Sequence, residues 1–245
     1  MRIKITGNGK DGVFPLDYRM MVTSMIKKAI ENSDEEYYKE LYLFDNKKNK
    51  KIKPFCFGVY FNDYEINGNL VKVNGNISII VSTPDYNIGI ALYNGLLNMN
   101  EYNFKNQYTF MKRRVMLEKE NNISSEKAKF KTLSPIHIRD KENNVIDVND
   151  SRFGEELNYI TNVLLDSYRG CGLKEKLIFT PINMKKMVIK EKVSGFVDNS
   201  SKEYLYINAY SGRFTLEGDI EDLKLLMQLG IGFRRSEGFG LIDLM

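Results

Sequence analysis

Cysteine and histidine are scarce in this sequence, and their scarcity removes several classes of protein. The 245 residues include two cysteines, Cys56 and Cys171, and one histidine, His137. Two cysteines so far apart cannot build the disulfide framework of a small secreted domain. Without a Cys-x-x-Cys pair or a histidine cluster, the chain offers no ligand set for zinc. We therefore expect no metal and no cofactor.

Long apolar runs are also missing. No window approaches the roughly 18 apolar residues that a membrane span requires, and residues 1–20 lack a charged segment followed by an apolar stretch. We expect no membrane contact and a cytoplasmic location. The formal net charge of +4 is too small to indicate a nucleic-acid partner by itself, so local clusters of basic residues must carry that inference.

The most informative stretch lies at the C-terminus, where glycines and arginines alternate with apolar residues. An amphipathic helix precedes it, with Asp219 as its N-cap. The stretch contains Gly230, Gly232, Arg234, Arg235, Gly238 and Gly240. Glycines allow backbone N–H groups to approach a phosphate without hindrance from a Cβ atom, and arginines at the apex would add charge-assisted contacts. A flexible hairpin with solvated arginines is the alternative interpretation.

The string G-I-G-F-R-R-S-E-G-F-G resembles the glycine-rich signature of the CRISPR-associated repeat-processing endoribonucleases, a branch of the RAMP (repeat-associated) superfamily. Residues 130–139, 153–168 and 214–219 agree with that family in the same order. The resemblance implies an α+β fold of two tandem ferredoxin-like (RRM-like) domains with a C-terminal glycine-rich loop. It also implies binding of CRISPR repeat RNA and metal-independent cleavage to a 2′,3′-cyclic phosphate and a guide RNA. Other CRISPR effector subunits and a second copy of the chain stay open as partners.

Apolar periodicity in the first half predicts the order strand, helix, strand, strand, helix, strand, which is typical of a ferredoxin-like unit. A helix is expected from Asp17, and a hairpin is expected to turn at Asn74-Gly75. A strand from Tyr108 to Glu118 closes this half. We expect an N-terminal domain over residues 1–120 and a C-terminal domain, which carries the glycine-rich loop, over residues 121–245.

The second half is expected to repeat the first with divergence. Residues 119–129 are polar without apolar periodicity, which favours a linker. The stretch from Leu133 to Arg139 then predicts a strand whose Ile136 and Ile138 face inward while His137 and Arg139 face outward.

Cleavage of RNA through its 2′-hydroxyl requires a base, donors for the developing charge and an acid for the leaving oxygen. Family members place a histidine between the first helical region and the next Phe-x-Phe strand, and this chain has none there. That interval, residues 40–53, offers Tyr42 and Lys51 as catalytic candidates, although a tyrosine with a pKa near 10 is a poor base at pH 7. We interpret His137 as a surface residue, with RNA contact or catalysis as the alternative.

Two lysine groups complete the predicted RNA-binding set. Lys47 and Lys48 lie in a lysine-rich run that is either a solvated loop or a track for a phosphate backbone. Lys186 and Lys190 lie on one side of a predicted strand because their spacing is even. The alternative function is a RAMP subunit that binds CRISPR RNA without cleaving it, either naturally or through an inactivating substitution.

Overall fold

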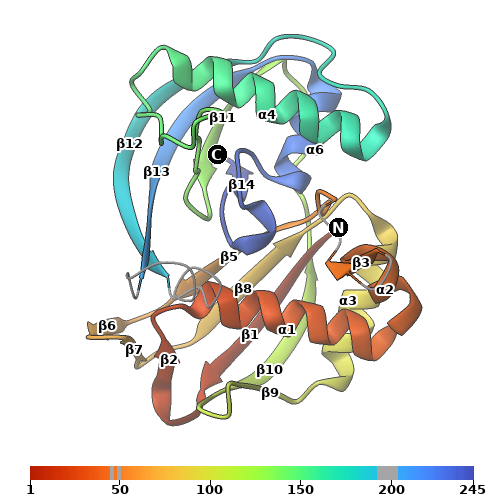
Figure 1. Ribbon diagram of the computed structural model, residues 1–245, viewed down its shortest axis with the longest axis vertical. Coiled ribbons are helices and arrows are strands. Elements are labelled where there is room, and N and C mark those ends of the chain that lie inside the picture. The colour runs from red at the N-terminus through yellow and green to blue at the C-terminus, as the bar shows by residue number, and fades with distance from the viewer. Residues whose placement is uncertain (45–46, 49–50, 192–203) are drawn as a thin grey trace. The chain divides into compact units, whose positions relative to one another are not determined.

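The computed structural model describes residues 1–44, 47–48, 51–191 and 204–245, with the backbone alone for residues 44, 47 and 48. The chain divides into two compact units (Figure 1). Unit 1 comprises Met1–Lys53 and Val59–Lys119, and unit 2 comprises Pro54–Gly58 and Glu120–Met245. The expected domain ranges, 1–120 and 121–245, stay predictions. Among the described residues, no helix is both long enough and apolar enough to span a membrane.

Unit 1 is built around a sheet with the strand order β5-β8-β1-β10-β9 (Figure 1). Its strands are β1 (Arg2–Gly9), β5 (Cys56–Phe61), β8 (Ile77–Ser82), β9 (Glu101–Phe104) and β10 (Tyr108–Glu118). The first three residues of β5 are grouped with unit 2. Its helices are α1 (Tyr18–Ser33), α2 (Glu35–Tyr42) and α3 (Tyr86–Asn98). Taken in chain order, β1, α1, β5, β8, α3 and β10 form the ferredoxin-like sequence of elements that periodicity predicts.

The core of unit 1 lies where α1 and α3 pack on each other and on the sheet. Ile3 and Ile5 of β1 are fully buried, as the alternation of the first strand predicts. On α1, the apolar positions that recur every three or four residues are all buried: Met21, Val22, Met25, Ile26, Ala29 and Ile30. Asp85 is the N-cap of α3, and its carboxylate accepts hydrogen bonds from the N–H groups of Asn87 and Ile88. This carboxylate cap satisfies two of the N–H groups that a helix start leaves unpaired.

The hairpin predicted at Asn74-Gly75 is wrong. Instead, β7 (Leu70–Val73) pairs with β6 (Tyr64–Asn67) and β2 (Val13–Pro15) in a separate three-stranded sheet, whereas β8 pairs with β1. The hairpin turn falls at Gly68-Asn69, between the paired residues Asn67 and Leu70, and Gly68 has a φ of +62°. Asn-Gly and Gly-Asn both satisfy the local turn rule, and the buried side chains of Val71 and Val73 select the pairing. A two-stranded ribbon, β3 (Leu43–Phe44) with β4 (Lys47–Lys48), follows α2.

Unit 2 repeats the same topology. Its strands are β11 (Lys127–Thr132), β12 (Ile178–Glu191), β13 (Leu205–Glu217) and β14 (Ile242–Leu244), and its helices are α4 (Arg152–Arg169) and α6 (Ile220–Leu229). The sheet order β14-β11-β13-β12 matches β10-β1-β8-β5 of unit 1 position by position. The prediction of an α+β protein with two ferredoxin-like domains is therefore confirmed.

Aromatic stacking joins the layers of unit 2. The ring of Phe153 on α4 lies 4.9 Å from that of Phe179 on β12, which in turn stacks at 4.9 Å on Phe214 of β13. Phe130 of β11 continues the stack at 5.8 Å from Phe214. Aromatic pairs at these separations contribute beyond the area that they bury, so the stack fixes α4 against three neighbouring strands.

The expected strand from Leu133 to Arg139 is wrong, whereas the expected linker over 119–129 is present but shorter, because it ends where β11 begins. The strand β11 begins at Lys127 and ends at Thr132. Residues 133–138, which we call the anchor segment, form only an isolated bridge between Ile136 and Tyr210. Ile136, His137 and Ile138 are all buried, because the segment is covered on both sides instead of presenting one solvated face.

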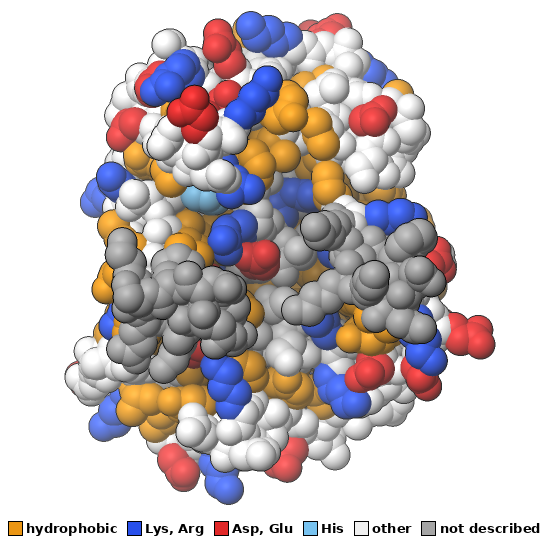
Figure 2. All heavy atoms as spheres, in the orientation of Figure 1, with side chains coloured by type: hydrophobic (Ala, Val, Ile, Leu, Met, Phe, Trp, Pro, Cys, Tyr) orange, Lys and Arg blue, Asp and Glu red, His pale blue; other side chains and the backbone are white. Residues whose placement is uncertain are grey.

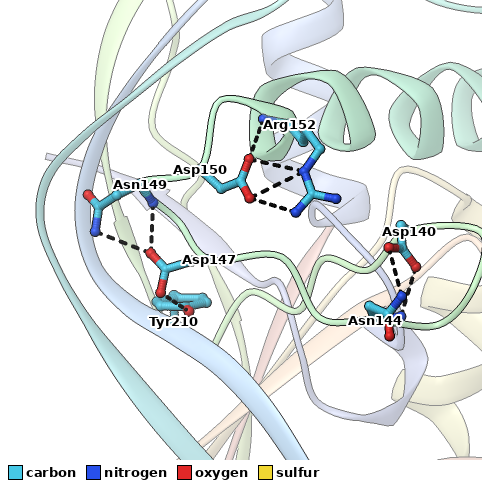
Figure 3. Close-up of polar contacts among 7 residues, drawn as sticks. All are labelled: Asp140, Asn144, Asp147, Asn149, Asp150, Arg152 and Tyr210. Carbon is cyan, nitrogen blue, oxygen red and sulfur yellow. Dashed lines mark hydrogen bonds and ion pairs between the residues drawn. The ribbon is translucent and has the colours of Figure 1, made fainter.

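The loop between the anchor segment and α4 is ordered by its own aspartates (Figure 3). Asp147 accepts hydrogen bonds from the hydroxyl of Tyr210 at 2.8 Å and the N–H of Asn149 at 3.0 Å. Asp140 accepts from the N–H of Asn144 at 2.8 Å. Short aspartate side chains of this kind close turns by satisfying nearby backbone donors, so the loop has a defined path without regular secondary structure.

The close approach of α1 and α3 generates a stability prediction. A Cβ atom at Gly95 would meet the carbonyl oxygen of Ala29, whereas one at Gly89 would meet the movable end of the Met1 side chain. Alanine in a helix interior is otherwise favoured over glycine by about 1 kcal/mol. We expect Gly95→Ala to lower the free energy of unfolding by about 1–3 kcal/mol. In urea unfolding, Gly89→Ala serves as the matched control, and equal stability of the two variants would contradict the packing.

Candidate functional site

The glycine-rich loop, residues 230–240, folds back on the anchor segment through backbone hydrogen bonds. The N–H of Phe233 donates to the carbonyl of His137 at 2.9 Å, and the N–H of Gly240 donates to that of Pro135 at 2.8 Å. Within the loop, the N–H of Ile231 donates to the carbonyl of Gly240 at 2.9 Å. Both ends of the loop are thus held together and tied to one neighbouring segment.

Glycine is required where this contact is tightest. A Cβ at Gly232 would lie 2.7 Å from the carbonyl oxygen of His137, and one at Gly240 would collide with the carbonyl oxygen of Ile231. Both residues have positive φ values, +79° and +71°, which side chains with a Cβ rarely adopt. The glycines therefore allow the loop to close on the anchor segment.

The expected approach of glycine N–H groups to a phosphate is wrong for three of the four glycines. The N–H groups of Gly230, Gly238 and Gly240 donate to carbonyl oxygens of the chain itself, those of Leu226, Arg235 and Pro135. A donor already used in this way is not available to a ligand without breaking the loop. Side chains, not these backbone groups, must supply contacts from the loop.

The two arginines of the loop differ in exposure. Arg235 is 7% exposed, and its Nη1 donates to the carbonyl of Leu229, the last residue of α6, at 2.9 Å. Burial lowers its pKa to about 10, so the guanidinium stays charged at neutral pH. A cation at a helix C-terminus complements the unpaired carbonyl groups there. The expectation that Arg235 stands at the apex of the loop is therefore wrong, and its guanidinium caps α6.

Arg234 is the outward arginine. Its side chain is 28% exposed, and its Nη1 pairs with a carboxylate oxygen of Glu237 at 2.6 Å. The residue has a φ of +58° and stands at the start of a short 3-10 turn, Arg235–Glu237. This left-handed conformation turns neighbouring side chains to opposite sides, one inward and one outward.

His137 is buried, in contrast to the surface position that we expected. It is 5% exposed, its Nδ1 lies 2.8 Å from the carbonyl oxygen of Asn208, and the rings of Phe233 and Phe239 flank it. Burial lowers the pKa of His137, the hydrogen bond to Asn208 opposes that change, and the charges of Arg234 and Arg139 lower the pKa further. The imidazole is therefore neutral at pH 7. Lys and Arg side chains are spread over the face of the molecule that Figure 2 shows.

In unit 1, Tyr42 is the centre of a lysine cluster. The Nζ of Lys27 lies 5.0 Å and that of Lys53 lies 5.5 Å from the centroid of its ring. The Tyr42 hydroxyl is buried without a hydrogen-bond partner among the described residues, and burial raises its pKa. A tyrosine in this state keeps its proton at neutral pH, which disfavours it as a general base.

The pKa of Lys53 is shifted in the opposite direction from that of Tyr42. Burial lowers its pKa, and the neighbouring ammonium groups of Lys27 and Lys51 lower it further. Lys51 itself is exposed, and its carbonyl accepts a hydrogen bond from the Nζ of Lys53 at 2.8 Å. Lys53 thus contacts both predicted candidates, Tyr42 through its ring and Lys51 through its carbonyl, and the sequence predicted neither Lys53 nor Lys27 as a site residue. Lys53 ends the lysine-rich run that is visible in the sequence, whereas no sequence signal places Lys27 of α1 beside Tyr42.

The remaining predicted lysines lie elsewhere. Lys186 and Lys190 stand opposite Tyr210 and Tyr206 in the continuous part of the β12–β13 pairing, and they therefore share a face. The Nζ of Lys190 lies 3.7 Å from the ring centroid of Tyr204. Lys47 and Lys48 form β4, but their side chains lie outside the described part of the structure. In that part, no three His, Cys, Asp or Glu side chains gather as metal ligands.

The family is decided by the C-terminal half. The family model described as CRISPR associated protein Cas6, C-terminal, matches residues 118–244. The chain belongs to the Cas6 family. The matched residues contain the whole glycine-rich loop, the anchor segment and all strands of the second ferredoxin-like unit. The resemblance to the repeat-processing branch of the RAMP superfamily is therefore confirmed.

Solved structures with the same fold agree with this assignment. A Cas6-related protein from Pyrococcus furiosus is 20% identical, with a TM-score of 0.82 over 100% of this chain and 98% of that one. A RAMP protein described as binding different RNA substrates is 17% identical, with a TM-score of 0.81 over 100% and 99%. A Cas6 product complex is 14% identical, with a TM-score of 0.67 over 100% and 99%. A search of curated proteins found no match.

The different positions of the two loop arginines generate a second stability prediction. We expect Arg235→Ala to lower the free energy of unfolding by about 2–4 kcal/mol, because it leaves a cavity and an unpaired carbonyl at the end of α6. Arg234→Ala removes an exposed ion pair and is expected to cost less than about 1 kcal/mol. Urea unfolding followed by circular dichroism measures both. If Arg234→Ala were the more damaging change, the inward position of Arg235 would be contradicted.

Proposed function

We propose that this chain binds CRISPR repeat RNA and cleaves it within the repeat without a metal ion, leaving a 2′,3′-cyclic phosphate and a guide RNA. Membership of the Cas6 family supports this activity. The structural relatives described as an RNA-binding RAMP protein and as a Cas6 product complex support RNA as the ligand. The observation that carries the catalytic part is the lysine cluster around Tyr42.

The cluster contains groups suited to each requirement of the reaction. The 2′-oxygen forms a bond to phosphorus, the bond from phosphorus to the 5′-oxygen breaks, one proton leaves the 2′-hydroxyl and another reaches the 5′-oxygen. Lys53, with its lowered pKa, is the candidate for proton transfer. Lys27 and Lys51 supply positive charge for the phosphorane oxygens. The Tyr42 hydroxyl keeps its proton but is buried, so Tyr42 serves the reaction through its ring, which holds Lys27 and Lys53 in position.

RNA binding requires a wider surface than the reacting groups. Arg234, Lys186 and Lys190 stay our candidates for phosphate contacts in unit 2, and Lys47 and Lys48 stay candidates in unit 1. Contacts of this kind position the backbone without reading the base sequence. We propose that Gly230, Gly232, Gly238 and Gly240 serve RNA binding indirectly, because they set the position of Arg234.

A non-catalytic RAMP subunit is the second candidate function, and one observation favours it. The one histidine of the chain is buried against Asn208, Phe233 and Phe239, so the usual imidazole of RNA-cleaving sites is not offered at the expected interval. In this case the lysine cluster would hold a phosphate group without breaking its ester bond, and guide RNA would remain bound as a component of an effector complex.

Substitutions at Lys53 test the proposed reaction. With repeat RNA in EDTA, Lys53→Ala should lower the cleavage rate by a factor of about 10² or more. Lys53→Arg keeps the charge but cannot release its proton at neutral pH, so it should bind RNA normally and cleave as slowly as the alanine variant. Lys39→Ala is the matched control, since Lys39 is exposed and paired with Glu35 on α2. The wild-type rate should rise with pH toward the pKa of Lys53, which lies below 10.5.

The outcomes separate the two functions. A single cut ending in a cyclic phosphate supports the endoribonuclease, and tight binding with intact RNA supports the non-catalytic subunit. If Lys53→Arg cleaves at the wild-type rate, Lys53 contributes only its positive charge and transfers no proton. If Lys53→Ala cleaves at the wild-type rate, the lysine cluster takes no part in the mechanism. Failure to bind repeat RNA would overturn both candidate functions.

A further inference from the structure

Three basic side chains meet around Phe233 at the surface of unit 2. The guanidinium carbon of Arg139 lies 4.9 Å from the centroid of the Phe233 ring, and the His137 ring lies 6.4 Å from the same centroid. Arg234 follows Phe233 in the chain, and both arginines act on the charge of His137. Arg139, Phe233 and Arg234 are all half-buried, so the group is held by packing and still reaches solvent.

Arg139 is held in place by the turn that follows the anchor segment. Asp140 and Asn144 close that turn (Figure 3), and Asn143 within it has a φ of +69°. The side-chain oxygen of Asn143 accepts a hydrogen bond from Nη1 of Arg139 at 2.6 Å. Stacked on Phe233 and tied at Nη1, the guanidinium keeps Nε and Nη2 without partners among the described residues. An arginine restrained in this way loses little freedom when it binds an anion.

In the free protein, the guanidinium of Arg234 forms an ion pair with the carboxylate of Glu237. The two side chains are 28% and 42% exposed, and the pair joins residues only three apart. An exposed pair of this kind is weak, with a typical value below about 1 kcal/mol. A phosphate group, with its stronger bidentate geometry toward a guanidinium, can replace the carboxylate.

His137 lies close enough to both arginines for their charges to lower its pKa, and its Nε2 has no hydrogen-bond partner among the described residues. The carbonyl of Asn208 can only accept, so Nδ1 of His137 must donate to it. In the neutral ring, Nε2 then holds a lone pair. Burial is the main cause of the lowered pKa of His137, and the charges of Arg234 and Arg139 add to it. A phosphate placed beside the arginines would offset their contribution and raise the pKa, so that Nε2 could take a proton from solvent and become a third donor.

We propose that Arg139, Arg234 and His137 form a phosphodiester-binding subsite, which Glu237 occupies until RNA replaces its carboxylate. The subsite rests on the proposed function for its natural ligand, a phosphate of the RNA backbone. Arg139 and His137 lie outside the glycine-rich loop and add two phosphate contacts to the one that Arg234 of the loop supplies. In the free protein, the Glu237 carboxylate offsets the charge of Arg234 but not that of Arg139, so the subsite keeps a net positive charge for a phosphate.

The single histidine permits a direct test with inorganic phosphate. In untagged protein, nuclear magnetic resonance reports the ring of His137 without any assignment problem. The pKa of His137 should rise by about one unit when phosphate replaces chloride at equal ionic strength. The same exchange in Arg139→Ala should leave that pKa nearly unchanged. No shift in the wild type, or an equal shift in Arg139→Ala, would overturn the subsite.

Binding of repeat RNA supplies the second readout. Arg139→Ala should weaken binding by about ten- to a hundredfold and make the slope against salt concentration shallower by about 0.7. Glu237→Gln should tighten binding by about two- to fivefold, because it removes the competing carboxylate. Arg152→Ala is the control, since Arg152 is an exposed arginine paired with Asp150 outside the subsite.

Failure of the subsite and failure of the proposed function are distinguishable. If the wild type does not bind repeat RNA, the proposed function is wrong, and the phosphate titration still decides the subsite. If the wild type binds RNA while Arg139→Ala and Glu237→Gln bind equally well, the subsite is wrong and the RNA-binding function stands. A Glu237→Gln variant that binds more weakly would show that Glu237 positions Arg234 and does not compete, which contradicts the proposed exchange.

Discussion

The main-chain pairing between the glycine-rich loop and the anchor segment is the constraint on which unit 2 depends. Hydrogen bonds from Phe233 to His137 and from Gly240 to Pro135 leave no space for a Cβ at Gly232 or Gly240. Because this contact fixes the path of the loop, it also decides which way each loop side chain points. The glycine signature therefore encodes a backbone geometry first, and any ligand contact follows from that geometry.

Two adjacent arginines acquire different roles from this geometry. The guanidinium of Arg235 turns inward to the end of α6, where a cation compensates unpaired carbonyl groups. The guanidinium of Arg234 turns outward to Glu237. The same distinction between inward and outward charge recurs in unit 1, where Lys53 is partly buried and its pKa lowered, while Lys51 is exposed. In both places, burial determines what a basic residue can do, and the residue type alone does not.

The sequence predicted most of the fold because its signals were local. Apolar periodicity located α1, Asp219 marked the start of α6, and alternation placed β10 at Tyr108–Glu118. Prediction from the sequence failed where long-range packing determines the structure. Asn74-Gly75 satisfied a turn rule, but the hairpin formed at Gly68, and the alternation through His137 hid a segment covered on both sides. At the candidate sites, the sequence alone pointed to Tyr42, Lys51 and Arg234 as candidate residues. The contributions of Lys27, Lys53 and Arg139 depend on contacts between distant segments, which spacing does not reveal.

Amide hydrogen exchange of the glycine-rich loop tests the central claim most directly. If the loop is closed on the anchor segment before any ligand binds, the amides of Ile231, Phe233 and Gly240 exchange slowly in the free protein. Addition of RNA should then leave their protection nearly unchanged. Rapid exchange in the free protein, with protection gained only on RNA binding, would contradict the account. It would show that these N–H groups are unpaired in the free protein and become protected only when RNA binds.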